Sequence, residues 1–127
     1  MTTQEVADRF VTLMREGQSA QIHEELYAPD IESIEPEGMP GAYVKGMEGI
    51  QEKARQWEAM IETMHSGTVG DPIVADNHFA CTMHYRVTFK GAPGPTDMEQ
   101  ICLYTVDEGK ITREMYYYKP TEEPATT

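Results

Sequence analysis

The sequence predicts an α+β domain in which three helices come first and an antiparallel sheet follows. Two observations support this class. Apolar residues recur at helical spacing in the first half of the chain, whereas the second half is rich in Val, Ile, Thr, Tyr and Phe and is divided by turn residues. Helices that precede strands, instead of alternating with them, favour α+β over βαβ units. The length of 127 residues is that of one domain.

The first half of the chain predicts three helices and one strand. Thr2 and Glu5 have the spacing of a capping box, and the apolar residues behind them predict a helix over 3–16. A short helix over 20–27 ends before a proline, a strand follows at 30–35, and a loop rich in Pro and Gly comes next. Beyond this loop, the apolar stripe of a third helix comprises Ile50, Ala54, Trp57, Ile61 and Met64. The charged residues predicted to point away from that stripe are Glu48, Glu52, Lys53 and Arg55.

The second half of the chain predicts the sheet. Its four predicted strands are 66–75, 78–90, 98–107 and 110–119. Tight turns at Asp76-Asn77 and at 107–109 join them, so the last three strands form an antiparallel meander. Residues 1–119 are therefore predicted to be a single domain, followed by a flexible polar tail at 120–127.

Composition and charge exclude several classes of partner. The chain has ten Lys and Arg residues but 22 Asp and Glu residues, which gives a formal net charge of -12. Phosphate backbones and anionic lipid would therefore repel it. We therefore expect neither a nucleic acid nor a membrane as partner. Cys81 and Cys102 lack metal-ligand spacing and no dinucleotide fingerprint is present, so no metal and no cofactor is expected. The absence of a secretory pattern predicts a reduced, cytoplasmic protein.

Four short motifs carry a family resemblance. They are Leu26-Tyr-Ala-Pro-Asp30, Gly46-Met-Glu-Gly-Ile50, Val74-Ala-Asp-Asn77 and Gly109-Lys-Ile-Thr-Arg-Glu114. In this order the chain resembles the nuclear transport factor 2-like superfamily, in its SnoaL-like and ketosteroid isomerase-like branch, from about Glu5 to Lys119. The resemblance implies a cystatin-like cone in which a curved sheet wraps over three helices packed in its concave face. It also implies an apolar pocket inside the cone and a homodimer through the outer face of the sheet.

The resemblance further implies which side chains line the pocket. From the strands these are Met83, Tyr85, Val87, Phe89, Ile101, Leu103, Thr112, Glu114, Tyr116 and Tyr118. The helices would add Phe10, Met14, Trp57 and Met60, although apolar residues at helical spacing are first expected in a core. His65 could turn toward the pocket or be an ordinary polar residue. The outer face, and with it the dimer contact, would hold His84, Arg86, Cys102, Tyr104, Arg113, Met115 and Tyr117.

Glu35 is the first candidate for catalysis. An ungapped alignment of residues 26–38 places it at the position of the general-base Asp of ketosteroid isomerase, directly before a proline. Pro36 keeps Glu35 extended and aims it into the cone. A lining of Met, Tyr and Phe would favour the protonated form and let the carboxyl exchange protons at neutral pH. The alternative is a solvated carboxylate in the acidic run 32–37.

The chain departs from ketosteroid isomerase at the groups that stabilise the enolate. That enzyme uses a Tyr and a protonated Asp. This chain has Phe10 at the Tyr position and Ile101, or Gln100 if one residue is gapped, at the Asp position. Loss of one such donor lowers the rate by about two to three orders of magnitude, so steroid isomerisation by the same groups is not expected. Tyr85, Tyr116 and Tyr118 offer substitute hydroxyls.

Glu114 is the second candidate for catalysis. SnoaL-like cyclases carry acid/base residues on the inner face of the last strand, and here Glu-Met-Tyr stands where they have His-x-Asp. Two carboxyls in one dry cavity divide into an acid and a base, so Glu35 and Glu114 would form such a pair, with Tyr118 or another tyrosine as partner. Alternatively, Glu114 bonds Arg86 or Arg113 at the surface of the sheet.

The sequence leaves two functions open. The first is a small dimeric protein that binds a small hydrophobic molecule, polyketide-like or terpenoid, and moves protons on it as an isomerase, cyclase or dehydratase. The second is a non-catalytic ligand-binding or interaction module in which the cone is core and Glu35 is a surface acid. The fold supports both functions, so individual residues must decide between them.

Overall fold

Residues 1–39 and 41–119 are described by the computed structural model of the chain. The elements in chain order are α1 (Thr3–Arg15), α2 (Ser19–Leu26), β1 (Tyr27–Ile34), β2 (Tyr43–Lys45), α3 (Met47–Met60), β3 (Ile61–Val69), β4 (Ile73–Ala75), β5 (His78–Phe89), β6 (Thr96–Asp107) and β7 (Lys110–Tyr117). The predicted tail at 120–127 lies outside the described residues. None of the described helices is both long and apolar enough to span a membrane.

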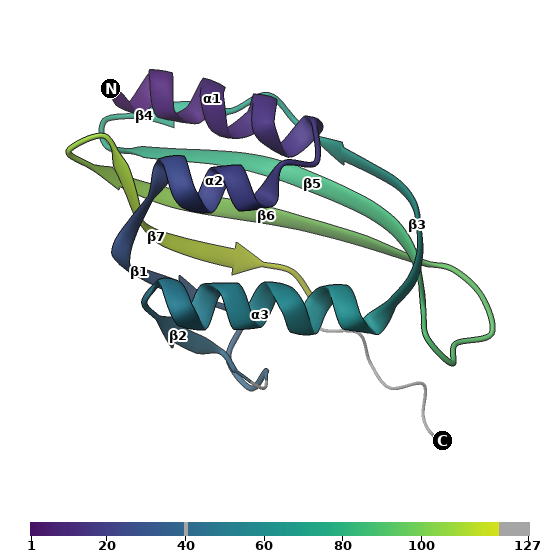
Figure 1. The fold of residues 1–127 in the computed structure, drawn as a ribbon. Coiled ribbons are helices and arrows are strands. Elements are labelled where there is room, and N and C mark those ends of the chain that lie inside the picture. Colours follow the sequence, from purple (N-terminus) through teal and green to yellow (C-terminus); the bar gives the residue numbers. More distant parts are fainter. Residues whose placement is uncertain (40, 120–127) are drawn as a thin grey trace.

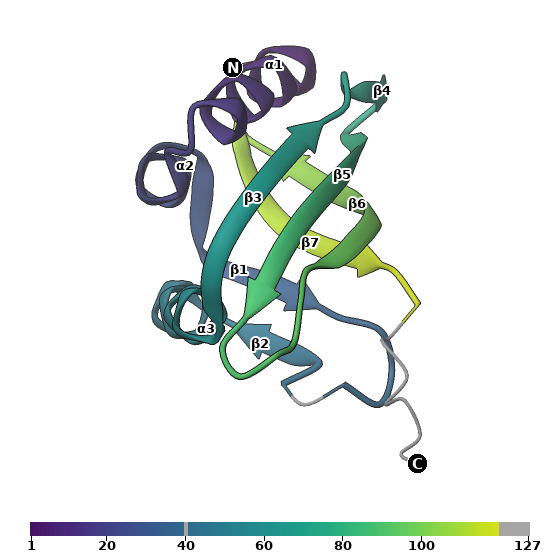
Figure 2. The same ribbon diagram turned by 90° about the vertical axis from the view of Figure 1, so that its right-hand side faces the viewer.

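The strands form one curved sheet. Its order is β2-β1-β7-β6-β5-β3, and β4 pairs with β5. The predicted meander is present, because β5, β6 and β7 pair antiparallel, whereas β1 runs parallel to β7. All three helices lie on the concave side of the sheet (Figure 1, Figure 2). The α+β class and the mostly antiparallel, curved sheet predicted from the sequence are confirmed.

Local signals in the sequence account for several boundaries. The Glu5 amide donates to Thr2 Oγ1 at 3.1 Å and the Thr2 amide donates to Glu5 Oε1 at 2.8 Å, so the predicted capping box begins α1. The turn between β6 and β7 has φ of 49° at Glu108 and 76° at Gly109. Two successive positive φ angles are what a two-residue hairpin turn requires.

The main difference from the predicted elements lies at the end of α3. The apolar stripe predicts a helix through Met64, but α3 ends at Met60 and Ile61–Val69 forms β3 against β5. Pairing with the sheet satisfies the backbone of this segment and outweighs its helical spacing. In addition, β1 begins at Tyr27, three residues before the predicted strand, and Tyr43–Lys45 forms β2 where no strand was expected.

An aromatic core fills the concave side of the sheet under α1. It consists of Phe10, Phe79 and Tyr104, whose ring centroids lie between 4.6 and 5.5 Å apart and whose side chains are buried. Each of the three rings comes from a different element, so the cluster ties α1 to β5 and β6. Phe10, which the resemblance places in the pocket, is therefore a packing residue at this position.

Candidate functional site

Polar side chains gather on the concave side where β1 and β7 run in parallel. Ser33 of β1 is paired in register with Glu114 of β7, and both side chains are buried. Glu35 follows two residues after Ser33 and so points to the same side of the chain. α3 packs against β1 and supplies a lysine. We call this group the polar cluster; its members are Ser33, Glu35, Lys53, Glu114, Tyr116 and Tyr118.

Both carboxylate oxygens of Glu35 have a partner. Lys53 Nζ lies 2.5 Å from Oε2, and the Tyr118 hydroxyl donates to Oε1 at 2.6 Å. The Glu35 side chain is 14% exposed. Glu35 is thus a largely buried carboxyl held between a cation and a phenol, and it differs from the solvated loop acid that was the alternative.

Lys53 connects the two strands of the cluster. Its Nζ donates to Ser33 Oγ at 2.7 Å and lies 5.0 Å from the centroid of the Tyr116 ring. The prediction that Lys53 points away from the apolar stripe of α3 is wrong. Lys53 lies three residues after Ile50 and four before Trp57, so it shares their side of the helix, and its stem carries the ammonium group to the sheet.

Glu114 is the buried acid of the cluster, with 3% of its surface exposed. It accepts hydrogen bonds from the Tyr27 hydroxyl at 3.1 Å and from the Tyr116 hydroxyl. Burial raises the pKa of Glu114, and the two phenols and the Lys53 charge oppose this effect. The alternative of a surface ion pair is therefore wrong; Arg86 pairs with Asp97 on the sheet surface instead.

The tyrosines of the cluster are hydrogen-bond donors. Burial raises the pKa of Tyr116 and of Tyr27, and the neighbouring Glu114 charge adds to this effect. The pKa of Tyr118 is raised by burial and, next, by its hydrogen bond to Glu35. Each hydroxyl therefore keeps its proton at neutral pH and donates it to a carboxyl oxygen.

On β5, the predicted inner residues do lie on the concave side. Met83 and Val87 are buried, and the Tyr85 hydroxyl lies 3.2 Å from Met83 Sδ. Phe89 meets the Trp57 ring edge-on at a centroid distance of 5.8 Å. Met14 is partly buried against the core cluster. These side chains build the wall and the core of the cone, but they make no hydrogen bond to the polar cluster in the described residues.

On β6, the predicted faces are reversed. Ile101 is 52% exposed, whereas Cys102 and Tyr104 are buried, and Leu103 shares the outer face with Ile101. Cys102 stands opposite Cys81 of β5, which fixes the inner face. Because the run 101–104 is apolar on both faces, hydrophobic alternation could not distinguish them.

Because of the reversal on β6, Gln100 and not Ile101 lies on the inner face. Gln100, the alternative to Ile101, is on the inner face, and its Nε2 lies 3.6 Å from Met83 Sδ. The amide therefore reaches the interior of the cone at the position that the gapped alignment gives to the isomerase Asp.

Two further pocket predictions also differ from the structure. His65 is exposed, and its Nε2 lies 2.7 Å from Thr88 Oγ1 on the strand position that alternates with buried Val87. His65 therefore lies on the outer face. Met60, at the end of α3, is 51% exposed, because the helix ends there and its stripe no longer faces the sheet.

A hollow of about 540 Å³ opens beside Glu35. We call it the Glu35 hollow; it is lined by Ile34, Glu35, Pro36, Glu37, Ala42, Tyr43, Met115, Tyr116, Tyr117 and Tyr118. Most of these side chains are apolar or aromatic. A volume of this order is typical of sites for small molecules. The hollow lies at the end of β1 and β7, whereas the resemblance implied a pocket in the middle of the cone.

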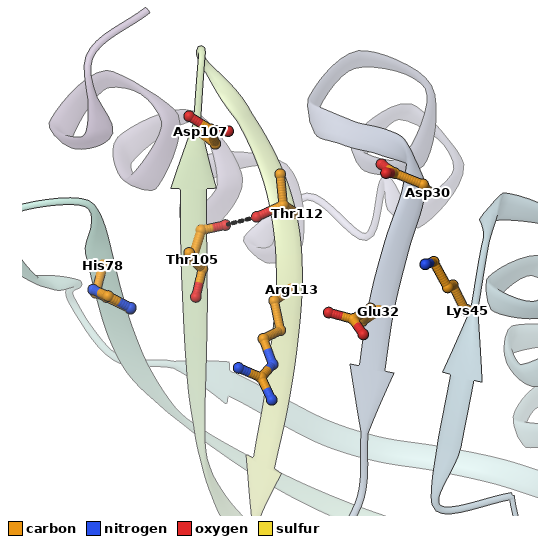
Figure 3. A pocket seen from close by; sticks show the side chains of 8 residues that line it. All are labelled: Asp30, Glu32, Lys45, His78, Thr105, Asp107, Thr112 and Arg113. Atoms are coloured by element: carbon orange, nitrogen blue, oxygen red, sulfur yellow. Dashed lines mark hydrogen bonds between the residues drawn. The ribbon is translucent and has the colours of Figure 1, made fainter.

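A second hollow, of about 440 Å³, lies on the outer face of the sheet (Figure 3). Its lining is charged with both signs and consists of Asp30, Glu32, Lys45, His78, Thr105, Asp107, Thr112 and Arg113. Thr112, which was predicted to face the pocket, donates here to the Thr105 carbonyl at 3.4 Å, because the pairing of β6 and β7 shifts register at this point. Within the described ranges, no group of three or more His, Cys, Asp or Glu side chains is placed to hold a metal ion.

Three residues near the catalytic candidates were not predicted from the sequence. They are Ser33, Lys53 and Tyr27, which contact Lys53, Glu35 and Glu114 respectively. For Lys53 a signal exists, since it lies on the same side of α3 as Ile50 and Trp57. Ser33 and Tyr27 could be predicted only from the parallel pairing of β1 with β7, which joins segments about 80 residues apart in the chain.

Comparison with known proteins shows the family of this chain. The family model of the SnoaL-like domain matches residues 1–118. The chain belongs to the SnoaL-like family. A candidate SnoaL-like polyketide cyclase from Mesorhizobium loti is 36% identical, with a TM-score of 0.87 over 93% of this chain and 100% of that one. No functionally curated protein is significantly similar in sequence.

More distant SnoaL-like and related structures share the fold. A protein from Catenulispora acidiphila with a ketosteroid isomerase-like fold, solved in complex with trimethylamine, is 28% identical, with a TM-score of 0.65 over 75% of this chain and 71% of that one. An NTF2-like protein from Burkholderia thailandensis is 16% identical, with a TM-score of 0.80 over 94% and 92% of the two chains. The superfamily inferred from the sequence motifs is thus confirmed.

Proposed function

We propose that this SnoaL-like protein binds a small hydrophobic carbonyl compound in the Glu35 hollow and moves a proton on it. Glu35 is the general base, and the Glu114 carboxyl with the Tyr116 hydroxyl is the acid. The observation that carries the proposal is the different environment of the two carboxyls. Glu35 pairs with a cation at 2.5 Å, whereas Glu114 is 3% exposed and accepts hydrogen bonds only from phenols among the described residues.

This difference assigns the two roles. The Lys53 ammonium group pairs with Glu35 at 2.5 Å, and a base must be ionised before it accepts a proton. Burial favours the protonated form of Glu114. In that form the carboxyl can donate a proton to the Tyr116 oxygen, and the Tyr116 hydroxyl, which now donates to Glu114, turns to donate its own proton to the ligand. Tyr116 lines the hollow and bonds Glu114, and it therefore connects the buried acid to the ligand.

The lining supports a hydrophobic ligand. Tyr43, Tyr117 and Met115 provide apolar and aromatic surface around the hollow, and polar groups occur mainly at its Glu35 side. An apolar body with one polar end would match this distribution. The Mesorhizobium loti protein at 36% identity is named both a SnoaL-like polyketide cyclase and a carbohydrate phosphatase. The first of these names is consistent with a hydrophobic carbonyl compound.

The test measures proton abstraction directly. The probe is 2-tetralone, an apolar ketone with acidic α protons, and the readout is exchange of these protons for deuterium, followed by NMR. We expect Glu35→Gln to lower the exchange rate by about two to four orders of magnitude. Glu37→Gln is the matched control, because Glu37 lines the same hollow. Equal rates in both variants and in the unaltered protein would refute the catalytic role.

The same experiment separates catalysis from binding alone. If 2-tetralone binds, as judged by calorimetry, but exchanges at the rate of the buffer in every variant, the protein is a ligand-binding module. Binding that is lost in Tyr43→Ala and kept in Ile73→Ala would then still assign the Glu35 hollow as the binding site, since Ile73 is 75% exposed on β4.

We also propose a homodimer through the outer face of the sheet. Ile101 and Tyr117 are cross-strand neighbours that are 52% and 49% exposed, and Leu103 pairs with Met115 beside them. These four residues form an apolar row on two strands, which association would remove from water. Met115 and Tyr117 also line the Glu35 hollow, so the proposed dimer contact borders the proposed ligand site. We expect Tyr117→Glu to give monomers by light scattering, whereas Ile73→Glu leaves the mass unchanged. An unchanged mass in Tyr117→Glu would contradict this interface.

A further inference from the structure

Lys53 stands where a developing negative charge would need a partner. Ketosteroid isomerase stabilises its enolate with two acids, and this chain has neither at the corresponding positions, because Phe10 is in the aromatic core and Gln100 bonds Met83. A proton abstraction by Glu35 would leave the substrate oxygen negative. The described residue with a full positive charge in direct contact with Glu35 is Lys53.

The geometry of Lys53 leaves room for one more partner. An ammonium group has three N–H donors. Two of them are directed to Glu35 Oε2 at 2.5 Å and to Ser33 Oγ at 2.7 Å. The third N–H has no hydrogen-bond acceptor among the described residues, and Nζ lies 5.0 Å from the centroid of the Tyr116 ring. Lys53 does not itself line the Glu35 hollow, but its side chain is 28% exposed and it contacts two residues that do, Glu35 and Tyr116.

We propose that Lys53 stabilises the enolate oxygen of the substrate, and that the ligands of this protein are therefore carbonyl compounds that form an enolate or phenolate. This inference rests on the proposed function of Glu35. The α C–H bond of the substrate breaks, its proton forms an O–H bond with Glu35, and the electron pair moves to the carbonyl oxygen. Lys53 stabilises this enolate until the Tyr116 hydroxyl, the acid of the proposed function, returns a proton to it. Lys53 is then paired with a carboxylate before the step and with an enolate after it.

Such an exchange of partners keeps the site neutral throughout. Before the step the charges are Glu35 negative and Lys53 positive; after it Glu35 is neutral and the enolate is negative. No charge is left without a partner in a largely buried site, where an unpaired charge is costly. Ser33 holds Nζ in place from the other side during this change.

The test uses phenols as stable mimics of the enolate. The probe is 4-nitrophenol, whose ionised form has its own absorption band, so absorbance reports both affinity and ionisation of the bound molecule. We expect Lys53→Met to weaken phenolate binding by about tenfold to a hundredfold, the effect of losing a hydrogen bond to a charged group. Lys45→Met is the control for net charge, because Lys45 lies in the outer-face hollow. Phenolate binding that is equal in Lys53→Met and Lys45→Met would overturn the proposal.

A second variant separates this role from that of the base. In Glu35→Gln the Lys53 charge has lost its carboxylate, so 4-nitrophenolate should bind more tightly although deuterium exchange of 2-tetralone fails. If exchange is unaffected by Glu35→Gln while phenolate binding still depends on Lys53, the base assignment fails and the lysine assignment stands.

Should Lys53→Met not fold, Glu35→Gln/Lys53→Met removes both charges and is compared with Glu35→Gln alone. Equal phenolate affinity in these two would again overturn the proposal.

Discussion

The aromatic core and the polar cluster share strands of the sheet but differ in the side chains that they bury. On β6, Tyr104 belongs to the aromatic core with Phe10 and Phe79, and every ring there is buried against another ring. Directly across the strand pair, Tyr104 stands opposite Glu114, the buried acid of the polar cluster. One cross-strand step thus separates a group that packs from a group that is costly to bury.

This difference teaches where to look for function in such a cone. An apolar cluster lowers the free energy of the fold by burial alone, and its residues need no further explanation. Two largely buried carboxyls with one lysine and three phenols oppose folding unless each group is paired, and among the described residues no buried side-chain N or O lacks a partner. Such a cluster is better explained by chemistry than by stability.

The largest effect on stability is expected in the aromatic core. Phe10→Ala removes a fully buried ring and leaves a cavity between α1, β5 and β6, so the free energy of unfolding should fall by about 3–5 kcal/mol. Urea unfolding measures it. Tyr118→Phe, which removes only a hydroxyl from the other end of the cone, should cost about 1 kcal/mol. Equal losses in the two variants would show that the two ends do not differ as described.

A smaller effect is expected from the charge of Glu114, and it depends on pH. Burial raises the pKa of Glu114 in the folded state above the usual value of 4.5. The folded state therefore binds more protons than the unfolded state once the pH exceeds 4.5, and stability is lost as the pH rises from there to the folded pKa. Glu114→Gln should remove this loss, which amounts to at most about 1.4 kcal/mol per pH unit.

The measurement compares urea unfolding of the two proteins across that range. The effect of Glu25 on stability has the opposite pH dependence. Hydrogen bonds from Arg9 and then from Gln21 lower the pKa of Glu25 to about 2, so the stability that it contributes is lost as the pH falls. Glu25→Gln is therefore the matched control at an exposed site. A constant difference between Glu114→Gln and the unaltered protein at every pH would show that the pKa of Glu114 is the same in the folded and unfolded states.

Much of the fold could be predicted because its signals are local. The capping box at Thr2, the hairpin turn at Glu108-Gly109 and the alternation along β5 depend on neighbours in the chain. The end of α3 could not, because Ile61–Val69 is a strand only through its pairing with β5. The inner face of β6 likewise needed its register with Cys81.

The site was predictable only in part, for a related reason. Glu35, directly after β1, and Glu114, in β7, stand out in the sequence as candidate carboxyls, but what they contact comes from the parallel pairing of β1 with β7 and from the packing of α3. Lys53 resembles any exposed helix lysine until its stem is seen to reach Glu35. The sequence identifies the candidate groups, whereas the contacts that they make are long-range.

The smallest effect on the free energy of unfolding is expected at Ser33, a buried residue of β1 that belongs to the polar cluster. It is fully buried like a core residue, yet it accepts a hydrogen bond from Lys53 at 2.7 Å. Ser33→Ala should therefore lower the free energy of unfolding by only about 0.5–1.5 kcal/mol, because the partly exposed ammonium group can bind water instead. Ser66→Ala, on exposed β3, is the control and should be neutral. A loss several times larger at Ser33 would mean that Lys53 depends on this hydroxyl for its position, and that the polar cluster is as much a part of the framework as the aromatic core.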